Sequence, residues 1–111
     1  MKIQLRRAGS TTILDLDGPL SLGPPQQELR REVEGLMAAG AKLLAINLAG
    51  VAYMDSSGIG ELVRTYTVLR QAGGKCVLFA ANKQVMMLLK MVRLDTVLPM
   101  APDETAALAA S

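Results

Sequence analysis

The sequence predicts an α/β domain in which helices cover a mixed β-sheet. Short apolar segments with strand character alternate with amphipathic helical segments, which is typical of a sheet with a parallel core. Two strand-like segments follow each other directly at the start of the chain, which makes the predicted sheet mixed. The chain has 111 residues, half of them apolar. We therefore expect one domain, residues 1–111, that buries its own hydrophobic core.

The first two strands are predicted to form a hairpin. Apolar and polar residues alternate over Lys2–Arg6, and Thr11–Leu16 follows after the short turn Ala8–Ser10. Gly18-Pro19 ends the second strand.

Three amphipathic segments and one short segment are predicted to be helices. Each amphipathic segment carries apolar residues at helical spacing, and the first two end at Gly40 and at Gly73-Gly74. The predicted inward-facing residues, helix by helix, are Leu29, Val33, Leu36 and Met37, then Ile59, Leu62, Val63, Tyr66 and Leu69, and then Val85, Leu88, Leu89 and Val92. The short last helix opens at Pro102-Asp103-Glu104, where acidic residues suit the positive end of the helix dipole.

Three further strands alternate with these helices. They are expected at Lys42–Asn47, which is apolar enough to be central, at Lys75–Ala80 and, as a short strand or an extended segment, at Val97–Leu98. Leu48–Asp55, after the first of them, is predicted to be a loop. The expected order along the chain is β-β-α-β-α-β-α-β-α.

The composition excludes several classes of function. The chain has no histidine and one cysteine, Cys76, in a predicted buried strand. Ser–His and Cys–His catalysis, structural zinc and an internal disulfide are therefore excluded. The periodicity brings no carboxylates together, so we expect neither an enzyme nor a cofactor or metal site. The chain has 12 basic and 10 acidic residues, and no aromatic residues lie among the basic ones. We therefore expect no direct binding to nucleic acid.

No segment predicts targeting to or through a membrane. The N-terminus lacks the continuous apolar region of a signal peptide, and no apolar run reaches the ~18 residues of a membrane span. We therefore expect a cytoplasmic protein with no membrane partner.

The most informative segment joins the third strand to the second helix. Asp55, Ser56 and Ser57 precede the apolar run of that helix, and their side chains can accept hydrogen bonds from its first N–H groups. Gly58 and Gly60 are expected to let neighbouring backbone approach closely. Helix capping is the simpler interpretation of these residues. The alternative is a serine that is regulated by phosphorylation on a surface that faces a partner.

Together these residues resemble a known family. The stretch Leu44–Val63, supported by Asp15–Leu20 and Ala72–Lys75, is similar to the STAS domain (sulphate transporter and anti-sigma factor antagonist). The similarity is greatest to the small stand-alone bacterial anti-sigma factor antagonists, and it covers nearly the whole chain. The specific match is the strand and loop that lead through Asp-Ser-Ser-Gly into a helix. Ser21 is a departure, because many members have an acidic residue there.

The resemblance implies a switch built on protein binding. The unphosphorylated chain would bind an anti-sigma factor that is a serine kinase, and would thereby free the sigma factor. The kinase would phosphorylate Ser56, and a phosphatase of the metal-dependent Ser/Thr class would restore binding. Asp55 would support the serine and the kinase contact. The implied partner-binding residues are Asp55, Ser56, Ser57, Gly58, Ile59 and Glu61.

Some alternatives stay open at this point. Arg64 lies two turns after Ser56 on a helix face that is predicted to be solvated, and the alternative is that it meets an acidic partner. Met86, Met87 and Met91 are predicted to edge the core, with a second partner contact as the alternative. The rival function is that of a STAS scaffold or adaptor in a transporter or stress-signalling assembly, without a phosphorylation cycle. A weak homodimer also stays open.

Overall fold

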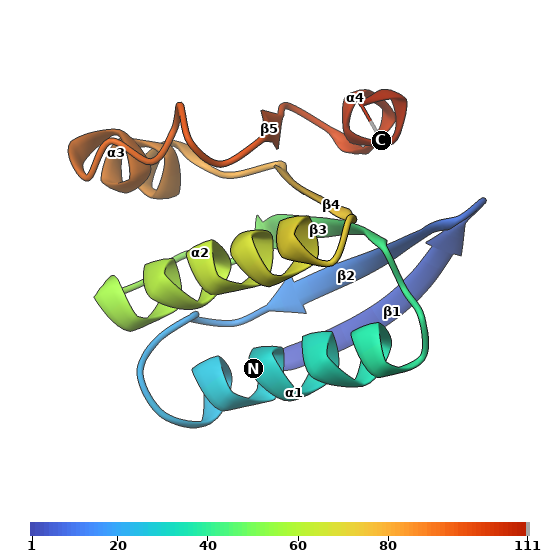
Figure 1. Cartoon of the computed structure of the whole chain (residues 1–111). Helices are drawn as coiled ribbons and strands as arrows, with labels where there is room; N and C mark the ends of the chain where they lie inside the picture. Colours follow the sequence, from blue (N-terminus) through green and yellow to red (C-terminus); the bar gives the residue numbers. More distant parts are fainter. Residues whose placement is uncertain (111) are drawn as a thin grey trace.

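A five-stranded mixed sheet with four helices accounts for residues 1–110, the part of the chain that this computed structural model describes (Figure 1). In chain order the elements are β1 (Lys2–Ala8), β2 (Thr11–Asp17), α1 (Pro24–Ala38), β3 (Leu43–Gly50), α2 (Ser56–Gln71), β4 (Lys75–Phe79), α3 (Lys83–Met91), β5 (Met100–Ala101) and α4 (Glu104–Ala109). The strands lie side by side in chain order, with β1 antiparallel to β2 and the other neighbours parallel. The predicted fold class and element order are confirmed.

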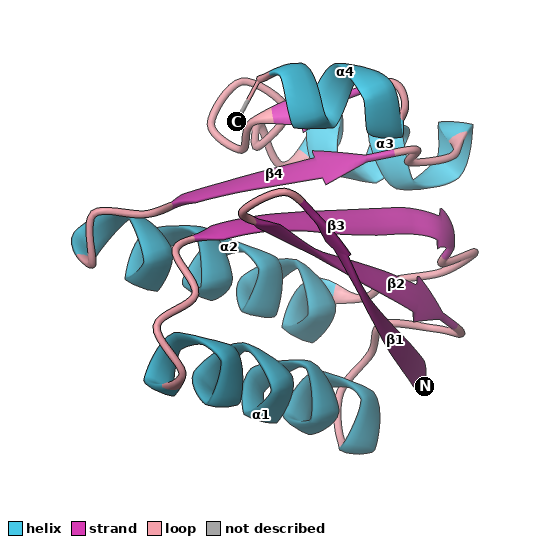
Figure 2. Ribbon diagram, turned by 90° about the vertical axis from the view of Figure 1, so that its right-hand side faces the viewer, coloured by secondary structure: helices cyan, strands magenta, loops and turns pink. Residues whose placement is uncertain are grey.

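Alternation along the strands divides the core between the two faces of the sheet. One face carries the larger cluster, with residues such as Leu14, Ile46 and Leu78, and α1 and α2 pack together on this side (Figure 2). The opposite face carries a smaller cluster, which is closed by Ala107 of α4. Its sheet residues are Ile13, Ala45, Val77 and Phe79.

A polar network on this second face joins elements that are distant in sequence. The guanidinium of Arg6 donates to both carboxylate oxygens of Asp15, at 2.6 and 2.9 Å, and to Glu104 at the start of α4. Asn47 of β3 donates to Asp15 at 2.9 Å. The network ties α4 to β1, β2 and β3.

The last strand lies later than predicted. β5 pairs its two residues with Leu78 and Phe79 of β4, whereas Val97–Leu98 precedes it outside the sheet. Leu98 is buried in the larger cluster, which explains its apolar character without a strand.

Two other boundaries also differ from expectation. β3 extends to Gly50, so that it includes the first part of the predicted loop. Val92 was predicted to face the core, but α3 ends at Met91 and Val92 is 48% exposed. Across residues 1–110, no helix combines the length and apolar character needed to cross a bilayer.

Candidate functional site

Two loops are joined at the carboxyl end of the central strands. The N–H of Leu20, in the loop between β2 and α1, donates to the carbonyl of Tyr53, in the loop between β3 and α2, at 3.0 Å. The N–H of Asp55 returns a bond to the carbonyl of Leu20 at 3.3 Å. Leu20 and Met54 form a parallel bridge, and both side chains are buried. The two loops therefore form one connected unit at the start of α2.

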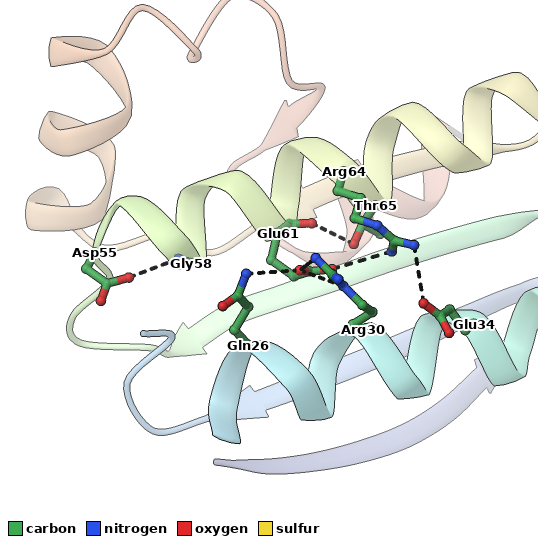
Figure 3. Close-up of polar contacts among 8 residues, drawn as sticks. All are labelled: Gln26, Arg30, Glu34, Asp55, Gly58, Glu61, Arg64 and Thr65. Atoms are coloured by element: carbon green, nitrogen blue, oxygen red, sulfur yellow. Dashed lines mark hydrogen bonds and ion pairs between the residues drawn. The ribbon is translucent and has the colours of Figure 1, made fainter. Parts of the chain in front are cut away.

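Asp55 holds this unit together through its side chain. One carboxylate oxygen accepts from the N–H of Gly58 at 3.0 Å and caps α2, as predicted (Figure 3). The other oxygen accepts from the N–H of Leu22 at 3.0 Å and so reaches the neighbouring loop. The bonds from Leu22 and Gly58 lower the pKa of Asp55 because they favour its ionised form. Asp55 is thus a fixed negative charge that positions the first turn of α2.

The two glycines of the segment have different roles. A Cβ atom on Gly58 would collide with the carbonyl oxygen of Leu20 and would lie 3.0 Å from its Cγ. Gly58 therefore permits the close approach that was predicted. A Cβ atom on Gly60 would meet no atom of residues 1–110 within 4 Å, apart from its own neighbours and helix. The prediction of close approach at Gly60 is wrong, because that position of α2 faces outward.

The two serines take no part in side-chain capping. Ser56 is the first residue of α2, and its side chain is exposed. Its hydroxyl makes no hydrogen bond within the described part of the chain. Ser57 is half-buried, and capping is left to Asp55. The structure thus gives the Ser56 hydroxyl no role in holding the fold.

Exposed apolar side chains lie in the same two loops. Leu22 is 72% exposed and Tyr53 is 59% exposed, and both flank the segment that Asp55 connects. The sequence reasoning missed both residues. Sequence pattern does not distinguish them, because each lies within two residues of another large apolar residue of its loop, Leu20 or Met54, that is buried.

Glu61 is fully buried, although it was expected on the docking surface. Its carboxylate accepts from Arg30 of α1, at 2.9 Å from Nη2 and 3.2 Å from Nε, and Gln26 Nε2 lies at 3.5 Å (Figure 3). The expectation of a surface position for Glu61 is wrong. The residue instead joins α2 to α1 beneath the surface.

Arg64 and Ile59 are also engaged within the domain. Arg64 lies 3.6 Å from the carboxylate of Glu61 and donates to Glu34 of α1 at 3.2 Å. Its Nη1 is buried without a hydrogen bond. Ile59 is only 8% exposed and belongs to the larger core cluster. Of the expected docking residues, the structure therefore leaves Asp55, Ser56, Ser57 and Arg64 with exposed side-chain surface, and it buries Gly58, Ile59 and Glu61.

Residues 1–110 contain no cluster of metal-ligating side chains. No three His, Cys, Asp or Glu side chains in this range lie close enough to hold an ion. Cys76 is buried, and burial raises the pKa of its thiol to about 12.

Comparison with known proteins agrees with this architecture. An anti-sigma F factor antagonist from Paenibacillus polymyxa is 25% identical over 108 residues, which are 97% of this chain and 92% of that protein. An anti-sigma factor antagonist from Mycobacterium paratuberculosis superposes with a TM-score of 0.83 at 19% identity, over 98% of this chain and 92% of that chain. The Bacillus cell fate determinant SpoIIAA, solved in its phosphorylated form, gives a TM-score of 0.74 at 20% identity, over 99% of this chain and 100% of that chain. The family model of the STAS domain matches residues 2–107, and the chain belongs to this family.

Proposed function

We propose that the protein is an anti-sigma factor antagonist controlled by phosphorylation of Ser56. In its unphosphorylated form it binds an anti-sigma factor that is a serine kinase, and so releases the sigma factor. The observation that carries the proposal is the exposed Ser56 hydroxyl, which makes no hydrogen bond within residues 1–110 and follows the anchored Asp55. Further support comes from the names of two relatives and from the phosphorylated form of a third.

The proposed role is regulatory binding and not catalysis. The kinase would transfer the γ-phosphoryl group of ATP to Ser56 Oγ, with loss of the hydroxyl proton and release of ADP. A metal-dependent Ser/Thr phosphatase would hydrolyse the ester with water and restore the hydroxyl. The chain itself would supply only the exposed hydroxyl and the surface around it.

The position of Ser56 would let a phosphate act on binding without unfolding the domain. A phosphate adds about −1.5 to −2 charges. The N-terminus of α2 favours negative charge through its free N–H groups and the helix dipole, so the isolated domain would tolerate the phosphate. The carboxylate of Asp55 would repel the phosphate group. A partner that packs on Leu22 and Tyr53 would also have to remove water from the phosphate. Phosphorylation would therefore weaken the complex more than the fold.

The test is to incubate the protein with ATP and a candidate kinase and to map the phosphate by mass spectrometry. Affinity for the kinase would be measured for the wild type, Ser56→Ala and Ser56→Asp, with Ser57→Ala as the matched control on the adjacent residue. We expect phosphate on Ser56 only, and a loss of affinity of at least about tenfold in Ser56→Asp alone. Binding without phosphorylation, insensitive to Ser56→Asp, would instead identify the domain as a STAS scaffold.

A further inference from the structure

Helix α3 carries large apolar side chains that the core does not use. Its buried residues are Val85 and Leu89. Met87 and Met91 are 62% and 77% exposed. At 100° per residue, these two methionines lie on the side of the helix opposite the buried residues. Leu88 lies between the two sides, because it is half-buried and packs against the larger core cluster.

The exposed side of α3 begins beside the loop that leads into Ser56. A hollow between α3 and this loop is lined by Tyr53 and Met54 on one side and by Gln84 and Leu88 on the other. Asn82 fixes the two parts relative to each other, because its side chain caps α3 and donates to the carbonyl of Val51 at 3.3 Å. Figures 1 and 2 both place α3 at the end of the molecule where α2 begins. The exposed apolar surface therefore extends from Tyr53 along α3.

The charged residues of α3 are all basic, whereas the neighbouring loop carries the negative Asp55. Lys83 and Lys90 lie on α3, Arg93 follows it, and α3 contains no acidic residue. All three side chains belong to exposed residues. Apolar surface flanked by positive charge complements a segment with an apolar side and acidic neighbours. Methionine side chains also adapt readily to the shape of an apolar partner.

We propose that α3 is the second half of the docking surface and binds an acidic amphipathic helix of the anti-sigma factor. The apolar side of that helix would lie over Met87, Met91 and the hollow beside Tyr53, and its carboxylates would lie near Lys83 and Lys90. This inference rests on the proposed function, which supplies the partner. It adds an anchor that does not depend on the state of Ser56.

The structure favours this occupant over an anionic membrane or a second copy of the chain. α3 has nine residues, and a membrane anchor of that length would place only two lysines near lipid. A second copy would bring the same positive charges against each other. The surface also continues into the loop that precedes Ser56, beside the residue at which the proposed partner acts.

The test compares Met87→Gln/Met91→Gln with Leu5→Gln, a control at an exposed apolar residue of β1, outside the proposed surface. Both variants change exposed side chains and should keep the wild-type melting temperature. Affinity for the anti-sigma factor would be measured by calorimetry, for the unphosphorylated and the Ser56-phosphorylated forms of each. We expect the double variant to bind about tenfold more weakly and Leu5→Gln to bind normally. Lys83→Glu/Lys90→Glu should slow association and reduce its dependence on salt.

The outcomes separate this inference from the proposed function. Loss of binding in Ser56→Asp with wild-type binding in the methionine variant would overturn the role of α3 and leave the switch intact. Failure of the wild type to bind any anti-sigma factor would overturn both. Two further results would assign α3 to another occupant, provided that the methionine variant still binds the partner normally. Sedimentation with anionic vesicles that is lost in this variant would assign α3 to a membrane. Self-association in the ultracentrifuge that is lost in this variant would assign α3 to a second copy.

Discussion

Replacement of Gly58 by alanine should destabilise the protein, whereas the same replacement at Gly60 should stabilise it. Both residues lie in the first turns of α2, where alanine is favoured over glycine by about 0.5–1 kcal/mol. Nothing within 4 Å in residues 1–110 opposes a methyl group at Gly60, so the full gain is expected there. At Gly58 the methyl group would overlap the carbonyl oxygen of Leu20.

The loss of stability at Gly58 depends on the kind of atom that the new methyl group would meet. Overpacking at a close contact costs about 1–3 kcal/mol, and a backbone carbonyl cannot rotate away as the end of a side chain can. We expect the upper part of this range, which the gain in helix propensity reduces to a net loss of about 1–2 kcal/mol. The two variants should then differ by about 2–3 kcal/mol, or about 8–12 °C in melting temperature for a chain of this size.

Thermal unfolding followed by circular dichroism, with urea titration at 25 °C, measures both variants against the wild type. The matched pair removes the helix-propensity effect, because both substitutions are glycine to alanine within one helix. Equal gains in stability at the two positions would show that Leu20 does not approach α2 closely, and the explanation given for Gly58 would then fail.

Three other outcomes are expected. Hydrogen bonds from backbone N–H groups, first that of Leu22, lower the pKa of Asp55. The ionised carboxylate therefore stabilises the fold above its ordinary pKa of about 4, and this contribution is lost as the pH falls through the folded pKa. Urea midpoints should fall less steeply on acidification in Asp55→Ala, and an unchanged slope would contradict the assignment. Arg30→Met should lower the urea midpoint more than Glu61→Gln does, because it leaves a buried carboxylate without its main donor; equal midpoints would argue against that burial. Because burial raises the pKa of Cys76 to about 12, its thiol should react with an aromatic disulfide reagent only after unfolding, and rapid labelling of the native protein would be inconsistent with this.

Local patterns were sufficient to predict most of the fold. Gly40 and Gly73 have positive φ angles just after α1 and α2, which is where the sequence predicted the helices to end. The cap of α2 was also predictable, since Asp55 bonds to a backbone group only three residues away. Such features depend on neighbours in sequence, and so a single sequence reveals them.

The errors arose where distant residues decide the outcome. Glu61 is buried because α1 brings Arg30 to it from 31 residues earlier, and no pattern within α2 indicates this. The last strand is placed by its register with β4, while burial gives Leu98 the same apolar character as a strand residue. The exposure of Met87 likewise depends on which side of α3 the sheet covers, and helical spacing alone does not fix that side.

The two edges of the sheet are both poorly suited to adding another strand. β1 forms one edge and carries Lys2, Arg6 and Arg7, so a second copy placed beside it would face like charges. β5 forms the other edge and has two residues, too few for a stable ladder. Edge-to-edge aggregation is therefore disfavoured by the architecture itself. The outer backbone groups of the sheet are thus guarded by like charge at β1 and by the shortness of β5, and the loops and helices remain as the surfaces for recognition.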